Sequence, residues 1–573
     1  MPGFRERAGN ALNHFFFQRI VSPLLSLSIN RKIRQFENAT KQPQEVQQKL
    51  LLSILRKHQN TSFARDHHFS SIKSIDAFRN NIGVAGYETI EPYMNRVLKG
   101  ETSALLADRR IHMFALTSGT TNTRKYIPVT DSYLDDYRRG WNIWGLNAFM
   151  KHDKAKFKPI LQMSGDWDEY RSESGVPCGS VTGLTARMQR KVIRWLYCVP
   201  PEVSRIKDSA SKYYTVMRLS IDKPLGMILA ANPSTLINLA KAGDLEKESL
   251  IKDLRDGTLS KRMDIPDDVR RVLASRIKKR PEKALQLEAI INKTGSLFPK
   301  DYWPEHCLLG NWTGGSMASY LRHYPKFYGS MPVRDVGLIA SEGRMTIPLE
   351  DNTPSGVLDI TTHFFEFIPE EEKGSSNPTV LLPHELVEGR NYFILFTTSY
   401  GLYRYDIHDV VRCTGFYNKT PLLQFLNKGS YFSNLTGEKI SEYQITGSMA
   451  EILRDLDLAL NIYSLAPIWN DEQPYYGLFI ESSDIPNPDV AIILANRMEE
   501  KLRTINIEYD SKRESLRLGP IKPMILQPGT WQKWDRERLK KTGGTLEQYK
   551  HPCLINDLAF KSQIEPSILP ILS

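Results

Sequence analysis

A short apolar run that breaks into a loop of hydroxyls and glycine is the most constraining feature of this sequence. Residues 114–130 read FALTSGTTNTRKYIPVT, and Ile111 to Leu116 are mostly apolar, as in the end of a buried strand. A second apolar stretch, residues 126–129, follows the loop. The loop offers backbone N–H groups, hydroxyls and the charge of Lys125, which suit an anion such as a nucleotide phosphate. The alternative is a solvated hairpin turn, because Ser, Thr, Gly and Asn are ordinary turn residues.

The length of the chain predicts at least two domains, because 573 residues exceed what one ordinary core organises. Five scattered cysteines without a CxxC pair argue against a disulfide framework or a zinc ribbon. They favour a reducing compartment, and we expect a cytoplasmic protein.

The net charge of +11 arises from 76 basic residues interspersed with 65 acidic ones. The short basic clusters lack interleaved aromatics, so we expect solvated helix faces and no nucleic-acid partner.

The apolar segment at residues 15–29 is interrupted by Arg19 and Pro23, so it is too short to span a membrane. We expect a packed N-terminal helix there and no transmembrane segment; a weak membrane-surface contact is the alternative.

The order of apolar patterns predicts an α/β fold. Residues 43–58 have the spacing of a helix with one apolar face and Pro43 at its start. Short apolar runs at 157–163, 214–220 and 225–230 alternate with helical stretches, as in βα units. Residues 236–296 are predicted to be helical and to form an outer layer or a lid.

After about residue 355 the pattern becomes rich in β-branched and aromatic residues, which predicts an antiparallel sheet or partly closed barrel. A polar stretch dense in Gly, Ser and Asn begins near residue 427 and separates this sheet from a mixed α/β end. We therefore predict a large N-terminal domain, residues 1–429, of mixed sheets with flanking helices and a β-barrel-like subdomain. A small mobile C-terminal α/β domain would follow at residues 430–573.

Several common chemistries have no motif in this chain. GxxxxGK[ST], GxGxxG, HExxH and GxSxG are all absent, which removes the main signals for Walker-type nucleotidases, dinucleotide enzymes, zinc proteases and nucleophile-elbow hydrolases. What remains is the hydroxyl loop.

The stretch TSGTTNTRK, residues 117–125, resembles the phosphate loop [ST]SG[ST]TGxPK of acyl-adenylate-forming enzymes. It departs at Asn122, where glycine is expected, and at Arg124, where proline is expected. Asparagine tolerates a left-handed backbone well, so the loop can keep its shape. Three further stretches resemble the auxin-responsive Gretchen Hagen family of acyl acid amido synthetases. They are TGGSMASY with VGLIASEGRMTIPL (313–320 and 336–349), GLYRYDIHDVVR (401–412), and SKRESLRLGPIKPMILQPGTW with GGTLEQYKHPCL (511–531 and 543–554).

This resemblance implies a site for ATP and Mg²⁺. Thr117, Ser118, Gly119, Thr120, Thr121 and Lys125 would bind the ATP phosphates. Ile339, Ala340 and Ser341 would lie beside the adenine, and Asp409 would bind both ribose hydroxyls. Glu342 would hold Mg²⁺, because a hard cation that bridges phosphates takes carboxylate oxygens. Asp406 is expected to lie outside the site and to be exposed.

Two lysines are assigned to catalysis on the same resemblance. Lys550, in EQYK, would offset the repulsion between the attacking carboxylate and the α-phosphate. Lys428 matches the family's hinge region. A solvated lysine is the alternative for an isolated position near a chain end, and a surface glutamate is the alternative for Glu342.

The implied activity is an ATP-dependent ligation in two half-reactions. A carboxylic acid is adenylated with release of pyrophosphate, and the amine of an amino acid then takes the acyl group to form an amide. No motif separates an amine acceptor from a thiol such as coenzyme A. A non-catalytic nucleotide- or membrane-binding protein on the same scaffold is a further alternative. The acid would contact Tyr133, Tyr137, Trp141 and Trp144, which could equally belong to the core.

Overall fold

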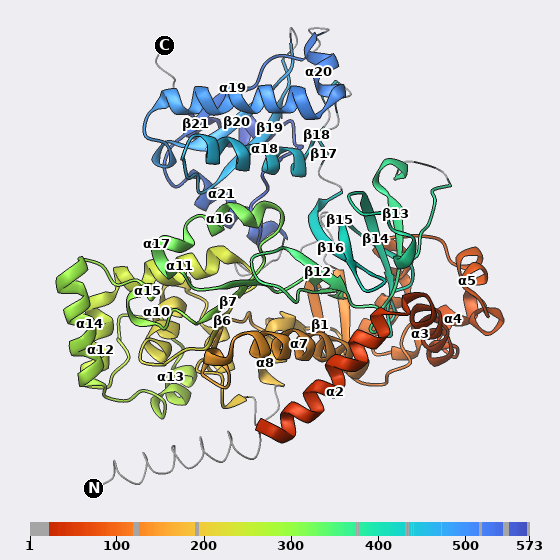
Figure 1. Cartoon of the computed structure of the whole chain (residues 1–573), viewed down its shortest axis with the longest axis horizontal. Helices are drawn as coiled ribbons and strands as arrows, with labels where there is room; N and C mark the ends of the chain where they lie inside the picture. Colours follow the sequence, from red (N-terminus) through yellow and green to blue (C-terminus); the bar gives the residue numbers. More distant parts are fainter. Residues whose placement is uncertain are drawn as a thin grey trace.

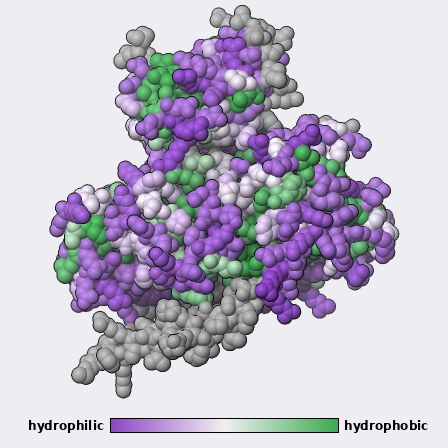
Figure 2. Space-filling view, viewed as in Figure 1, coloured by the Kyte–Doolittle hydropathy of each residue, from purple (hydrophilic) through white to green (hydrophobic). Residues whose placement is uncertain are grey.

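Figure 1 shows the computed structural model of the chain, a broad body with the C-terminal residues, in blue, packed on top of it. The structure describes residues 22–117, 125–188, 194–373, 375, 377–429, 432–433, 435–436, 438, 440–470, 473–514, 518–542 and 549–569. No helix in these ranges is both long enough and apolar enough to cross a membrane. Hydrophilic residues cover most of the face seen in Figure 2, and apolar residues appear there only in separate patches.

The N-terminal helices pack beside the antiparallel sheet in Figure 1. Helix α2 (Ser22–Thr40) covers the second half of the segment predicted at 15–29, whose first residues lie outside the described ranges. Helix α3 (Pro43–His58) confirms the prediction for 43–58. The amide nitrogen of the buried Gln47 donates to the carbonyls of Ile360 (2.8 Å) and His363 (2.7 Å), which fixes this helix to the sheet. The short helices that follow are α4 (Ser62–Asp66), α5 (Ile75–Asn81) and α6 (Glu91–Leu98).

The predicted strand–loop–strand is confirmed as an antiparallel pair, β1 (Ile111–Thr117) and β2 (Lys125–Thr130), in which Thr117 lies opposite Lys125. The sheet order is β2-β1-β5-β4, with β4 (Tyr170–Arg171), β5 (Pro177–Gly179) and a parallel pairing between β1 and β5. Helix α7 (Asp131–Lys151) leaves β2 directly and is capped by the Thr130 hydroxyl, which accepts from the Tyr133 backbone N–H.

A second four-stranded sheet, in the order β3-β6-β7-β8, is parallel throughout. Its strands are β3 (Ile160–Gln162), β6 (Met227–Leu229), β7 (Leu308–Asn311) and β8 (Val333–Asp335). Because the strands are parallel, Gln162, Asn311 and Asp335 end at the same edge of the sheet. Ligands of open α/β sheets bind at this edge.

One of the three predicted strand-like runs is wrong. Residues 214–220 belong to α10 (Ser209–Ser220), which Asp208 caps by accepting from the Ser211 N–H. Every residue from 214 to 220 is buried. A short run that is apolar or buried all round shows no helical period, so its pattern does not separate a strand from a buried helix. The other two runs contain β3 and β6, as predicted.

Helices cover the parallel sheet and form a thick layer at one end of the body (Figure 1). The prediction of helices over 236–296 is confirmed, and they pack as an outer layer. They are α11 (Pro233–Leu245), α12 (Lys247–Asp256), α13 (Asp267–Ala274) and α14 (Pro281–Thr294). The other short helices of this part are α8 (Val181–Arg187), α15 (Pro299–Tyr302), α16 (Ala318–Leu321) and α17 (Tyr324–Tyr328).

The β-rich pattern after residue 355 is confirmed as a six-stranded antiparallel sheet in the order β11-β12-β16-β15-β14-β13. The strands are β11 (Thr346–Ile347), β12 (Ser355–Leu358), β13 (Phe364–Pro369), β14 (Asn391–Thr397), β15 (Tyr405–Tyr417) and β16 (Thr420–Lys428). In this register Asp409 of β15 lies opposite Lys428 at the end of β16.

The C-terminal part is a mixed α/β unit, as predicted. Its three-stranded sheet has β20 at the centre, antiparallel to β19 and parallel to β21. Most of its apolar core, for example Leu465, Leu478 and Leu494, forms clusters separate from those of the preceding sheets. The elements are β17 (Phe432–Ser433), β18 (Ile440–Ser441), α18 (Glu442–Asp455), β19 (Tyr463–Ile468), β20 (Tyr475–Glu481), α19 (Pro488–Ile505), α20 (Ile507–Glu514), β21 (Lys522–Leu526), α21 (Thr530–Thr542) and α22 (Phe560–Ile564).

Candidate active site

The end of β1 lies against the segment that carries Glu342. The Ser341 hydroxyl donates a hydrogen bond to the carbonyl of Leu116 (3.1 Å), one residue before Thr117. The Tyr133 hydroxyl donates to the Ser341 carbonyl (3.0 Å). Ser341 is thus held between the strand that enters the predicted phosphate loop and the helix that follows this loop.

The loop itself is only partly described. Ser118, Gly119, Thr120 and Thr121 lie outside the described residues, as does the side chain of Thr117. Lys125 is described, and its Nζ lies 5.9 Å from the centroid of the Tyr87 ring. The Tyr87 hydroxyl accepts a hydrogen bond from the Tyr126 N–H (3.0 Å), which supports the first residues of β2.

Glu342 lies in the tight hairpin between β9 (Ile339–Ala340) and β10 (Gly343–Arg344) and is 5% exposed. The Tyr400 hydroxyl donates to its backbone carbonyl (2.8 Å). A Cβ on Gly343 would come 2.5 Å from the Tyr400 hydroxyl and 2.8 Å from Nε2 of His363, so this turn accepts only glycine. Ile339 and Ala340 are half-buried along β9.

The charge of the Glu342 carboxylate acts on four buried tyrosines. Burial, with a smaller contribution from the charge of Glu342, raises the pKa of Tyr87, Tyr133, Tyr400 and Tyr405. In the part of the chain that the structure describes, no group of three or more His, Cys, Asp or Glu side chains could hold a metal ion. A single carboxylate suits Mg²⁺, which usually keeps several waters and takes further ligands from phosphates. Glu342 therefore fits the predicted magnesium role.

Asp409 is 3% exposed and follows a strained residue. His408 has a φ of +61°, which non-glycine residues seldom adopt, and its carbonyl accepts a hydrogen bond from the Gly429 N–H (2.6 Å). The strain thus occurs where the predicted ribose carboxylate meets the predicted hinge. The side chain of Lys428, opposite Asp409, lies outside the described part of the chain.

The expectation that Asp406 is exposed is wrong. It is 4% exposed and forms ion pairs with Lys373 and with Nδ1 of His408 (3.2 Å). Burial alone would raise the pKa of Asp406, but the bonds from His408 and the charge of Lys373 lower it to about 2. The β15 pattern places Asp406 in the sheet, and its contacts with Lys373 and His408 let a carboxylate remain charged there.

Lys550 of the C-terminal part lies on the body of the molecule. Its Nζ is 4.2 Å from the centroid of the Trp312 ring, which directly follows β7, and 4.9 Å from that of Phe425 in β16. The amide nitrogen of Asn232 donates to the carbonyl of Tyr549 (2.6 Å), which fixes the backbone next to Lys550. The lysine therefore lies at the carboxyl edge of the parallel sheet.

Asp335 connects this lysine to the Glu342 segment. Burial raises the pKa of Asp335, and its bonds with Thr313 and Gly337, together with the charge of Lys550, oppose that rise. Its carboxylate accepts from the Thr313 N–H (2.6 Å) and from the Gly337 N–H (2.6 Å). The chain then runs from Gly337 directly into β9.

Three family models together match most of the chain. They are the GH3 family N-terminal domain at residues 32–333, the GH3 family central domain at 356–428 and the GH3 family C-terminal domain at 443–559. The chain belongs to the GH3 family. This confirms the resemblance read from the four motifs. The domain boundary predicted at residue 429 falls between the second and third family models.

Relatives of this GH3 protein align over nearly its whole length. The jasmonoyl–L-amino acid synthetase GH3.5 of Oryza sativa subsp. japonica is 26% identical over 92% of this chain and 95% of its own. The indole-3-acetic acid-amido synthetase GH3.4 of Arabidopsis thaliana is 24% identical over 93% of each chain.

Solved structures confirm the predicted fold class, with a large N-terminal and a smaller C-terminal part. The structure of AtGH3.15 acyl acid amido synthetase in complex with 2,4-DB matches with a TM-score of 0.82, at 20% identity, over 95% of this chain and 96% of that one. A 2-hydroxyisobutyryl-CoA ligase matches with a TM-score of 0.50, at 10% identity, over 92% and 94% of the two chains.

The tyrosines and tryptophans of α7 contribute mainly to the core of this GH3 protein. Tyr133, Tyr137 and Trp144 are buried, and only Trp141 is half-buried. The Trp144 Nε1–H donates to the carbonyl of Asp335 (2.8 Å), which anchors the helix below the sheet edge.

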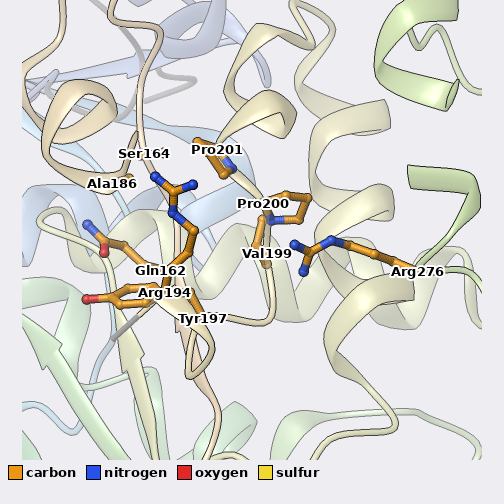
Figure 3. Close-up of a pocket in the computed structure, with 9 residues that line it drawn as sticks. All are labelled: Gln162, Ser164, Ala186, Arg194, Tyr197, Val199, Pro200, Pro201 and Arg276. Atoms are coloured by element: carbon orange, nitrogen blue, oxygen red, sulfur yellow. The ribbon is translucent and has the colours of Figure 1, made fainter. Parts of the chain in front are cut away.

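A pocket opens at the carboxyl end of β3 (Figure 3). Because β3 and β8 belong to one parallel sheet, this pocket shares an edge with Asp335. None of the described residues predicted for the site lines it. Figure 3 shows the nine lining residues as sticks: Gln162, Ser164, Ala186, Arg194, Tyr197, Val199, Pro200, Pro201 and Arg276.

Sequence reasoning missed four residues that the structure brings to the site. They are Tyr87, Trp312, Arg344 and Tyr400. Trp312 stands next to TGGSMASY, and Arg344 lies within VGLIASEGRMTIPL, so these stretches are the signal that could have identified them. Tyr400 likewise directly precedes GLYRYDIHDVVR. Tyr87 carries no such signal, because only the packing of distant segments brings it near this site.

Proposed function

We propose that this GH3 protein is an ATP- and Mg²⁺-dependent acyl acid amido synthetase. A carboxylate oxygen attacks the α-phosphorus of ATP, the bond to pyrophosphate breaks, and an acyl-adenylate forms. The amine of an amino acid then attacks the acyl carbonyl, AMP leaves with the bonding electrons, and the nitrogen loses a proton to give the amide. The observation that carries this proposal is the position of Lys550 at the carboxyl edge of the parallel sheet, beside the Asp335 segment that leads to Glu342.

The ATP site would be assembled from segments that the structure holds together. Thr117 to Thr121 and Lys125 would bind the phosphates, and β9 would lie beside the adenine. Asp409 would accept from both ribose hydroxyls. Glu342 would hold Mg²⁺, which when bound neutralises phosphate charge. The bond between Ser341 and Leu116 supports this arrangement, because it links the adenine and phosphate segments directly.

Lys550 would act in the first half-reaction. Two anions approach each other when a carboxylate attacks the α-phosphate, and charge then moves toward the leaving pyrophosphate. An ammonium held over the reacting groups stabilises that charge in the transition state. The faces of Trp312 and Phe425 hold the ammonium at this edge of the sheet.

The C-terminal part, from about residue 430, would move between the half-reactions. We propose that Lys428 belongs to the hinge and that rotation there withdraws Lys550 after adenylation. Among the described residues, polar bonds between the two parts include those from Arg322 to the carbonyl of Ala450 (2.9 Å) and from Asn232 to the carbonyl of Tyr549 (2.6 Å). Movement of this kind would exclude water from the labile acyl-adenylate in one position and admit the amine in the other.

All five cysteines are free, which supports a cytoplasmic location.

Release of pyrophosphate and AMP from ATP tests the proposed function. A panel of carboxylic acids is supplied with and without amino acids, to the wild type, to Lys550→Ala and to the exposed-lysine control Lys533→Ala. We expect acid-dependent pyrophosphate and amine-dependent AMP, lost in Lys550→Ala and retained in the control. AMP release that needs coenzyme A instead of an amine would assign a thiol acceptor. ATP binding without turnover of any acid would favour a non-catalytic scaffold.

A further inference from the structure

The residues on both sides of Lys550 bind the same acid. The Tyr549 hydroxyl donates to Oδ1 of Asp535 (2.7 Å), and Nδ1 of His551 lies 2.8 Å from this same oxygen. An ionised carboxylate only accepts hydrogen bonds, so His551 is the donor in the second contact. Asp535 belongs to α21 of the C-terminal part, and its side chain is 14% exposed. It therefore holds the chain immediately before and immediately after the proposed catalytic lysine.

This double contact sets the direction of the Lys550 side chain. Residues 549–551 form neither helix nor strand, and their contacts alternate as in an extended segment. In such a segment neighbouring side chains point to opposite sides. Tyr549 and His551 both reach α21, whereas Lys550 reaches two aromatic rings of the body. The segment thus lies between α21 and the body, with its lysine on the side of the body.

One face of α21 fixes the His551 ring. Trp531, Trp534 and Asp535 have the i, i+3, i+4 spacing that places side chains on one side of a helix. The centroid of the His551 ring lies 4.6 Å from that of Trp531 and 5.7 Å from that of Trp534. Trp531 is 1% exposed and belongs to an apolar core of the C-terminal part. Two packed indoles and a carboxylate therefore hold the residue that follows Lys550.

Ser464, His551 and Asp535 make contacts in the order of a hydrolase triad, but Ser464 cannot act as a nucleophile. Its hydroxyl oxygen lies 2.9 Å from Nε2 of His551. Ser464 is 0% exposed, and its hydroxyl donates to the carbonyl of Pro552 (2.7 Å). A nucleophilic serine needs an open side for the substrate and a base that takes its proton. Here the proton is given to a backbone carbonyl, so the three residues support the chain next to Lys550.

The contacts of Asp535 remain within the C-terminal part. Just beyond them, the Leu465 N–H donates to the carbonyl of Cys553 (2.8 Å), which fixes the following residues to β19. The bond from Asn232 to the carbonyl of Tyr549 (2.6 Å) instead comes from the body. A rotation of the C-terminal part would break the bond from the body and leave those to Asp535 and β19 intact. Asp535 can therefore keep the lysine segment in shape before it docks on the body.

We propose that Asp535 is a positioning residue for adenylation, which holds Tyr549 and His551 so that Lys550 is presented to the body in one direction. The inference rests on the proposed function and states how the moving part delivers its lysine. A charge that acts in a transition state must be placed accurately, and a displacement of about 1 Å can cost about 100-fold in rate. Because Asp535 acts through Lys550, its effect should be confined to the half-reaction in which this lysine acts.

The test compares Asp535→Ala with Glu499→Ala in the full chain. Glu499 is a matched control, because its side chain is 13% exposed and binds a tyrosine hydroxyl and a basic side chain, those of Tyr509 and Arg513, within the C-terminal part. Acid-dependent ATP–pyrophosphate exchange, amide formation from a presynthesised acyl-adenylate and the melting temperature are measured for each protein.

We expect Asp535→Ala to lower the kcat of exchange by about 10- to 100-fold, with the KM for ATP and the rate of amide formation within about threefold of the wild type. Glu499→Ala should lower the melting temperature and leave both half-reactions within about threefold. Equal losses in both half-reactions of Asp535→Ala would overturn the inference, because the role of Asp535 would then be structural. Exchange at the wild-type rate in Asp535→Ala would overturn it as well.

Tyr549→Phe removes one of the two bonds and keeps the ring. It should slow exchange by about fivefold and leave amide formation unchanged. The double variant Asp535→Ala/Tyr549→Phe should lose no more than Asp535→Ala, because the bond is already absent; a further loss would contradict a role through Tyr549. Where Asp535→Ala does not fold, Tyr549→Phe decides alone: slower exchange with unchanged amide formation supports the inference, and any other result overturns it.

The proposed function is tested separately by the wild type and Lys550→Ala. Wild-type exchange that is lost in Lys550→Ala keeps the proposed function in place, even where the Asp535 variants overturn the inference. If the wild type exchanges with no acid, or if Lys550→Ala exchanges at the wild-type rate, the proposed role of Lys550 fails and the inference fails with it.

Discussion

The ammonium of Lys550 lies 4.2 Å from the centroid of the Trp312 ring, although the two residues belong to distant parts of the chain. Trp312 is itself fixed, because its Nε1–H donates to the carbonyl of Gly337 (3.0 Å). The fixed ring of Trp312 thus contacts Lys550 at the carboxyl edge of the parallel sheet, close in sequence to the segment that continues to Glu342. This contact gives the C-terminal part a defined position in which its lysine can act.

Replacing Trp312 should slow adenylation more than amide formation. A desolvated cation–π contact is worth about 2 kcal/mol, so Trp312→Leu should lower the rate of acid-dependent pyrophosphate exchange by about 30-fold. Trp312→Phe should recover part of the loss. Amide formation from a presynthesised acyl-adenylate should change by less than about threefold in both variants. Trp469→Leu, at an exposed tryptophan, is the control. Equal losses in both half-reactions would show that Trp312 does not act through Lys550.

Glu342→Gln should abolish the response to magnesium. The amide retains the shape of the side chain but removes the negative charge that the proposed cation site supplies, and we expect a loss of about 100-fold or more in kcat. A magnesium titration of activity is the measurement, with Glu350→Gln at an exposed site as the control. An unchanged magnesium dependence in Glu342→Gln would assign the cation to other ligands.

Asp409→Asn and Asp406→Asn should separate binding from stability. Asp409→Asn removes one strong acceptor from the ribose and should raise the KM for ATP by about 10- to 100-fold, with a smaller effect on kcat. Asp406→Asn removes an anion that Lys373 and His408 surround, so it should lower the melting temperature while the KM for ATP stays within about threefold. The reverse pattern would mean that Asp406, not Asp409, contacts the ribose.

Asp136 should make the stability depend on pH. Burial raises its pKa to about 7 in the folded protein, well above the usual value for aspartate. Below the pKa of Asp136 in the unfolded chain, about 4, the residue is protonated in both states and its full contribution to stability is present. As pH rises from about 4 to about 7, the unfolded chain loses the proton while the folded protein keeps it, so the free energy of unfolding falls. Asp136→Asn still accepts the bond from the Ser399 hydroxyl (2.8 Å) but cannot ionise. Between pH 5 and pH 8 its stability relative to the wild type should therefore rise by about 2.5 kcal/mol.

Thermal unfolding of both proteins at pH 5 and pH 8 measures this effect. Parallel pH profiles for the two proteins would show that Asp136 has an ordinary pKa.

Local patterns were sufficient for most of the fold. The spacing of Leu51, Ile54 and Leu55 predicted α3, and the alternation of β-branched and aromatic residues after 355 predicted the antiparallel sheet. Residues 214–220 were misread because a helix that is buried all round has no amphipathic period. Burial of this kind depends on the packing of other elements, and no local pattern reports it.

Motifs located the candidate site better than they described its surroundings. The resemblance placed Lys550 on a segment that the structure brings to the carboxyl edge of the parallel sheet, and Glu342 on the hairpin that follows Asp335 at this edge. Asp409 lies in β15 of the antiparallel sheet, opposite Lys428. It did not identify Trp312 or Arg344, because their importance comes from contacts with Lys550 and with α7. Asp406 was expected to be exposed because it occupies a position where the family varies. The long-range ion pair with Lys373 explains how it can be buried.

Isotope transfer tests the central claim most directly. The acid is labelled with ¹⁸O in its carboxylate and turned over with ATP, Mg²⁺ and an amino acid, and the phosphate-containing products are analysed by mass spectrometry. Attack on the α-phosphorus followed by displacement of AMP predicts one ¹⁸O in the AMP and one in the amide. Label in inorganic phosphate would indicate an acyl phosphate instead, and AMP without label would contradict an acyl-adenylate.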